Sequence, residues 1–149
     1  MASAWLIRRF IDPKATFTFR DRPAGAEVPF DMYVGEFSHQ GSLCTFETLA
    51  ERFDISEPAV VRIGQIVHDL DLKENRYATP EAPAVGRLVS GLQELHTDDQ
   101  VLLQHGMDMF AALANSFSSS ESNGGRGPRL RKPKKRTHAV TTRKRRQKQ

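Results

Sequence analysis

Successive amphipathic segments constrain the fold of this 149-residue chain more than any other feature. Apolar residues recur at the three- and four-residue spacing of a helix from residue 45 to residue 117. Thr45 is the expected N-cap of one helix, Pro58 lies in the first turn of the next, and Thr97 with Gln100 predicts a capping box. The expected helices are Ser3–Ile11, Thr45–Phe53, 58–71, 79–95 and 97–117.

Two shorter segments near the N-terminus show the pattern of β-strands. Apolar and polar residues alternate over Ala15–Arg20, and Val28–Val34 is a second apolar segment that ends before a glycine. The sequence therefore predicts an α+β fold, mainly helical, with about five helices and two short N-terminal strands. A single domain over residues 2–117 has enough length to bury one core.

The charge is divided unevenly along the chain. Residues 1–125 contain 10 Lys and Arg against 18 Asp and Glu, whereas residues 126–149 contain 12 Lys and Arg and no acid. Residues 118–149 are also poor in apolar side chains, so they are expected to form a disordered basic tail. The tail could bind DNA through phosphate contacts at residues 126–149, serve as a localisation patch, or be a solvated appendage.

Cysteine usage and hydropathy restrict the setting of the protein. The single cysteine excludes an internal disulfide and favours a reducing, cytoplasmic compartment. No apolar run reaches about 18 residues, so no membrane span is predicted.

The stretch from Glu36 to Glu47 gathers several ligand-type side chains. His39 precedes Cys44 by five residues, and Gly41 lies between them. Imidazole and thiolate together suit a divalent transition metal such as zinc, iron or copper. Two alternatives remain open: Cys44 as a small buried apolar residue, and Cys44 as a reactive thiol near a helix N-terminus.

A second candidate pair lies on the helix expected at 58–71. His68 and Asp71 are three residues apart and therefore occupy neighbouring positions on one face. Asp71 falls within the apolar arc of that helix, where a buried acid needs a partner such as a metal. The alternatives are an Asp71 that ends the helix in solvent and a His68 that is favoured by the helix dipole.

Further polar residues are secondary candidates. Arg8 flanks the apolar face of the first expected helix and could bind an oxyanion, although a solvated arginine is the commoner outcome. His105 lies opposite the apolar stripe of the last helix and is expected at the surface or in a cleft. The common enzyme signatures are absent, so the sequence leaves open whether the protein is an enzyme.

Four pieces of the chain resemble the bacterial chromate-resistance family, in particular the C-terminal domain of its ChrB members. They occur in family order and are Ala2–Pro13, His39–Glu47, Ile66–Lys73 and His105–Met107. The resemblance implies a role in chromate resistance or in its control, with chromate or a metal ion as the ligand. Longer members of the family act as chromate-responsive regulators, so a regulatory role is one form that this function could take. It implies a polar site formed by His39, Cys44, His68, Asp71, Arg8 and Asp12, with Glu36 and His105 nearby.

The chain also departs from the family pattern at its N-terminal end. Family members carry a strand and an acidic turn before the segment that matches Ala2–Pro13, and the chain is expected to be a truncated member. Three functions follow as hypotheses. They are a chromate or metal site that uses His39, Cys44, His68 and Asp71, a DNA-associated module that uses the tail, and a metal-dependent enzyme.

Overall fold

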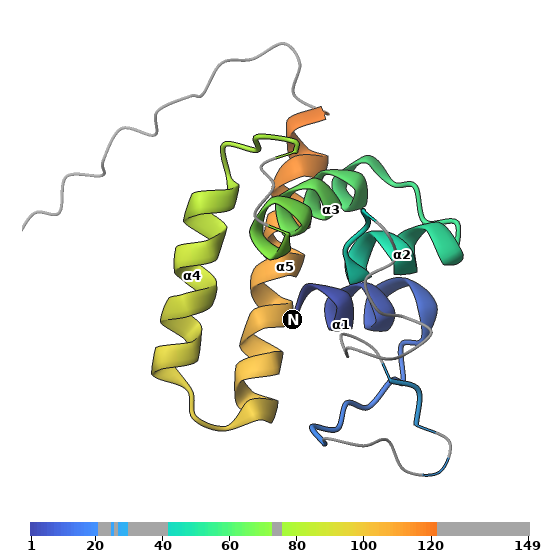
Figure 1. Ribbon diagram of the computed structural model, residues 1–149, viewed down its shortest axis with the longest axis vertical. Helices are drawn as coiled ribbons and strands as arrows, with labels where there is room; N and C mark the ends of the chain where they lie inside the picture. Colours follow the sequence, from blue (N-terminus) through green and yellow to red (C-terminus); the bar gives the residue numbers. More distant parts are fainter. Residues whose placement is uncertain (21–24, 26, 30–41, 73–75, 122–149) are drawn as a thin grey trace, which may run out of the picture.

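The computed structural model describes residues 1–20, 25, 27–29, 42–72 and 76–121. Helix α5 contacts α1, α3 and α4, and α2 contacts both α1 and α3 (Figure 1). All the described helices are too short or too polar to span a bilayer. The elements, in chain order, are α1 (Ala2–Leu6), the π-helix η1 (Ile7–Ile11), α2 (Thr45–Arg52), α3 (Pro58–Asp71), α4 (Ala82–Leu95) and α5 (Asp99–Glu121).

The prediction of two N-terminal strands is wrong for the described residues, which contain helices and no strand. Residues 30–34 of the second expected strand lie outside the described residues. In the first, the carbonyl of Ala15 accepts a hydrogen bond from Arg8, and the carbonyl of Phe17 accepts one from Gln100 on α5. These two carbonyls bond to side chains, whereas a strand would pair them with a neighbouring backbone, and residues 15–20 are not in a strand. The fold is therefore helical.

The first expected helix is present but changes its geometry halfway. Residues Ala2–Leu6 are α-helical, and the chain then widens to a π-helix in which the Asp12 N–H donates to the Ile7 carbonyl at 2.8 Å. Asp12 ends the element, because it is extended and its carboxylate accepts the Lys14 N–H at 2.9 Å. Trp5, on this segment, stacks on Phe46 of α2 and anchors the two elements together.

The last helix begins and ends differently from the prediction. Asp98 accepts the Val101 N–H at 2.9 Å and caps α5, so the capping box expected from Thr97 and Gln100 is wrong. The helix also continues past the expected end at residue 117 to Glu121. Within this extension, the hydroxyls of Ser118 and Ser119 donate to carbonyls one turn earlier in the helix.

Close contact between the chain start and α5 depends on a glycine. A Cβ at Gly106 would lie 2.5 Å from the sulfur of Met1, well inside van der Waals contact. Gly106 therefore lets α1 pack against α5, which places the α1–η1 segment beside the core.

Candidate functional site

The candidate site begins at the N-terminus of α2, which Cys44 caps in place of the expected Thr45. Glu47 accepts the Cys44 N–H at 3.0 Å, and the Cys44 sulfur accepts the Glu47 N–H. This reciprocal pair is a capping box with a cysteine in the position usually held by serine or threonine. The cap fixes the Glu47 side chain beside the thiol.

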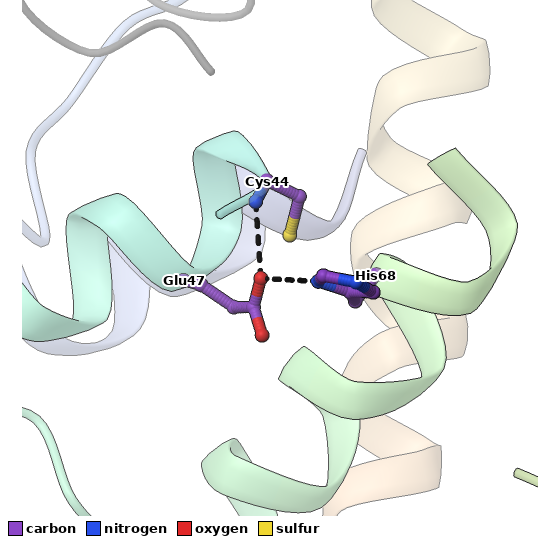
Figure 2. Close-up of side chains that lie close together, drawn as sticks. All are labelled: Cys44, Glu47 and His68. Atoms are coloured by element: carbon purple, nitrogen blue, oxygen red, sulfur yellow. Dashed lines mark hydrogen bonds and ion pairs between the residues drawn. The ribbon is translucent and has the colours of Figure 1, made fainter. Parts of the chain in front are cut away.

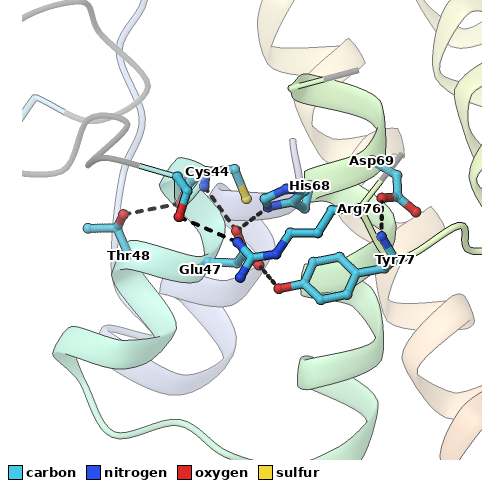
Figure 3. Close-up of polar contacts among 8 residues, drawn as sticks. Cys44, Glu47, Thr48, His68, Asp69, Arg76 and Tyr77 are labelled. Atoms are coloured by element: carbon cyan, nitrogen blue, oxygen red, sulfur yellow. Dashed lines mark hydrogen bonds and ion pairs between the residues drawn. The ribbon is translucent and has the colours of Figure 1, made fainter. Parts of the chain in front are cut away.

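Glu47 also joins α2 to α3 and to the segment that follows α3. Its Oε2 atom lies 2.7 Å from Nδ1 of His68, and its Oε1 atom accepts the Tyr77 hydroxyl at 3.0 Å (Figures 2 and 3). Both carboxylate oxygens are thus engaged by groups from three parts of the chain. One donor atom from each of Cys44, Glu47 and His68 lies within 4.8 Å of the others. We call these three residues the thiol–imidazole group.

His68 has one ring nitrogen without a protein partner. Its side chain is 0 % exposed, and Nε2 makes no hydrogen bond with the described residues. When Nδ1 carries the proton that it donates to Glu47, Nε2 presents a lone pair. A buried acceptor without a partner is costly, and a carboxylate bonded to the other ring nitrogen is typical of metal-binding histidines. The donor set therefore fits a metal ion.

Burial controls the protonation of the thiol. It raises the pKa of Cys44 to about 12, and the negative charges of Glu47 and Asp71 act in the same direction. Burial alone would also raise the pKa of Glu47, but hydrogen bonds from His68, the Cys44 N–H and Tyr77 outweigh it and hold that pKa below its usual range. At neutral pH the group therefore contains a protonated thiol next to a carboxylate, and this thiol is a poor nucleophile.

Asp69 fixes the segment that supplies Tyr77. Its carboxylate accepts the N–H groups of Tyr77 at 2.9 Å and Thr79 at 2.8 Å, and also the Thr79 hydroxyl at 2.8 Å. Burial would raise the pKa of Asp69, but these bonds lower it overall. Sequence reasoning missed both Glu47 and Asp69 as site residues. The capping-box spacing of Cys44 and Glu47 was the available signal for the first.

The structure brings together only part of the set predicted from the sequence. Cys44 and His68 meet, whereas Asp71 is exposed at the end of α3 and close enough for its charge to act on Cys44. His39 and Glu36 lie outside the described residues, and their roles stay predictions.

The other predicted residues have contacts elsewhere. Arg8 lies over the Phe17 ring at 5.1 Å and donates to the Ala15 carbonyl at 3.1 Å. Asp12 binds the Lys14 N–H at the end of η1. His105 is exposed on α5 and stacks on His96, with 4.4 Å between ring centroids.

A pocket of about 500 Å³ lies beside the thiol–imidazole group, between α2 and α3. Arg76 borders it, lies over the Tyr77 ring at 5.4 Å and donates to the Ser42 hydroxyl at 3.4 Å (Figure 3). We call this space the α2–α3 pocket. Its lining residues are Leu43, Phe46, Glu47, Ala50, Glu51, Asp54, Ile55, Ser56, Val60, Val61, Gly64, Gln65, Arg76 and Tyr77.

The fold and the site define a helical domain in which a buried thiol and a buried imidazole adjoin a partly exposed carboxylate that lines a pocket. The family described as "ChrB, C-terminal domain" matches residues 1–117, and the chain belongs to this family. This confirms the resemblance seen in the sequence. Protein ChrB of Cupriavidus metallidurans is 37% identical over 126 residues, which cover 80% of this chain and 37% of that protein. No solved structure matches the chain.

Proposed function

We propose that this chain acts in chromate resistance as a metal-binding domain, with Cys44 and His68 as protein ligands. Its family membership and its 37% identity to Protein ChrB support the chromate-resistance role. That relative is much longer than the region matched, so the proposal concerns the domain. The observation that carries the metal site is the unpartnered Nε2 of a fully buried His68. One nitrogen of the same ring also lies within 4.8 Å of donor atoms of Glu47 and Cys44, and Cys44 is the only cysteine in the sequence.

The donor types suit a transition metal of intermediate softness. Thiolate sulfur and imidazole nitrogen together bind zinc, iron, cobalt or copper better than magnesium or calcium. Glu47 is proposed to orient His68 as well as to cap α2, because both of its oxygens already accept hydrogen bonds. The bound metal would supply a positive charge that favours the thiolate, so the thiol would lose its proton on loading.

Metal analysis of the purified 149-residue chain tests this proposal. The wild type is expected to take up one Co²⁺ with a thiolate charge-transfer absorption band, and Cys44→Ala and His68→Ala are expected to lose it. His105→Ala is the matched control, because His105 is an exposed histidine on another helix. A wild type that stays metal-free and shows no such band would contradict the proposed site.

The alternatives remain less supported. DNA binding was predicted from residues 126–149, which lie outside the described residues, and residues 1–125 carry more acids than bases. An enzyme that uses Cys44 as nucleophile would need the thiolate, which burial disfavours in the metal-free protein. The metal-binding domain therefore accounts for more of the site than either alternative.

A further inference from the structure

The α2–α3 pocket and the thiol–imidazole group share one residue. Glu47 lines the pocket and also binds His68, whereas neither Cys44 nor His68 lines the pocket and both are 0 % exposed. The Glu47 side chain retains 13% of its exposure, so it connects solvent to the buried group. Tyr77 also lines the pocket, and its hydroxyl donates to the other carboxylate oxygen of Glu47.

The charges around the pocket favour one sign of ligand. Glu47, Glu51 and Asp54 contribute three carboxylates, and Arg76 contributes one guanidinium. Clefts lined by one sign of charge concentrate counter-ions and raise association rates. This balance attracts a cation and disfavours a dianion such as chromate.

We propose that the α2–α3 pocket is the access route by which a transition-metal cation reaches Cys44 and His68, so the ligand of this site is a cation and not the chromate oxyanion. The inference rests on the proposed metal-binding function and adds the route and the charge of the ligand. The inference is drawn from Glu47, which lines the pocket and accepts hydrogen bonds from both Cys44 and His68.

The route depends on free space beside Glu47, and Gly64 leaves that space. A Cβ at Gly64 would lie 3.4 Å from Phe46 and 3.7 Å from Cγ of Glu47, which is ordinary contact. Gly64 lines the pocket, so a larger side chain there would fill space beside Phe46 and Glu47. Gly91 on α4 provides a matched position, because nothing lies within 4 Å of a Cβ there.

The first test measures the rate of Co²⁺ loading into the metal-free 149-residue chain. The thiolate absorption band, recorded at low ionic strength, is the readout. The variant Glu51→Gln with Asp54→Asn is expected to slow association at least about threefold and to weaken its salt dependence. Glu94→Gln with Asp108→Asn, outside the pocket lining, is the control and should load at the wild-type rate. An unchanged rate in the pocket variant would overturn the route.

The second test blocks the route and changes the sign of the competing ion. Gly64→Leu should slow loading while Gly91→Leu does not, and both should finally bind one Co²⁺.

Sulfate, a tetrahedral dianion like chromate, should leave the rate unchanged relative to chloride at equal ionic strength and equal free Co²⁺. Slower loading with sulfate would mean that the pocket binds the anion and would overturn the inference. If the wild type never develops the band, the proposed function fails as well; a normal band with equal rates in all variants refutes only the route.

Discussion

Two polar regions of this molecule were both candidate sites, and they differ in whether their hydrogen-bonding groups are satisfied. Around Arg8, the guanidinium binds a backbone carbonyl, an amide oxygen and an aromatic face, and these contacts join η1, residues 15–17 and α5. Around Cys44, a fully buried histidine keeps one ring nitrogen without a partner among the described residues. The region around Arg8 therefore supports the fold, whereas the region around Cys44 has a buried polar atom that a ligand could bind.

The largest effect is expected from removing the carboxylate that holds the thiol–imidazole group. Glu47→Ala should lower the free energy of unfolding by about 3 kcal/mol, because α2 loses its cap and buried polar groups lose their acceptor. Urea denaturation measures this. Glu51→Ala, an exposed position on the same helix, should change stability by less than about 0.5 kcal/mol. If Glu47→Ala and Glu51→Ala were equally stable, the carboxylate of Glu47 would contribute no more to the fold than an exposed surface residue does.

Asp69 should show the next largest effect, together with a pH dependence. Asp69→Asn should cost about 2 kcal/mol at neutral pH, because three hydrogen bonds to a charged acceptor are weakened or lost. The lowered pKa means that the wild type has this stabilisation above about pH 4, the unfolded value, and loses it as the pH falls through the folded value. Urea titrations at several pH values should therefore show the two proteins converging in acid. If the stability difference between the wild type and Asp69→Asn stayed constant into the acid range, the stabilisation would not come from the ionised Asp69 carboxylate.

Substitution of Tyr77 is expected to affect metal affinity more than the stability of the fold. Tyr77→Phe keeps the ring under Arg76 and removes only the hydroxyl that donates to Glu47. Tyr77 holds Glu47, which is proposed to orient the ligand His68. Loss of a group that orients a metal ligand directly typically weakens binding about tenfold or more, so loss of this more distant hydrogen bond should lower Co²⁺ affinity by up to about tenfold. Competition titration with a chelator measures it. Unchanged affinity in a folded Tyr77→Phe variant would show that this hydrogen bond does not support the site.

Sequence reasoning found the chemistry of the site better than its geometry. Cys44 and His68 were identified from residue type alone, and the helices that carry them were placed within a few residues. Glu47 was not predicted as a site residue, because its bonds to His68 and Tyr77 join residues 21 and 30 positions apart. Local patterns do not report contacts at that separation.

The errors in the fold have the same origin. Alternation at Phe17 and Phe19 predicted a strand, but Phe19 is 51% exposed and the carbonyl of Phe17 binds Gln100, 83 residues away. On α3, Asp71 was predicted as a site residue because it lies within the apolar arc. The helix ends at Asp71, and the segment from Tyr77 to Thr79 covers Asp69 instead. In both places a distant segment decided which residue is buried.

The smallest effect should come from Arg8, and it bears most directly on the contrast between the two regions. Arg8→Ala should lower stability by about 1 kcal/mol, because it removes two hydrogen bonds and the contact with Phe17. It should leave Co²⁺ affinity and the thiolate band unchanged, since the guanidinium is engaged by residues outside the thiol–imidazole group. Parallel urea and cobalt titrations measure both quantities. Arg8→Lys keeps the charge but not the planar fork, so it should recover only part of the stability. A tenfold loss of cobalt affinity in Arg8→Ala would mean that the two regions are energetically coupled and form one site.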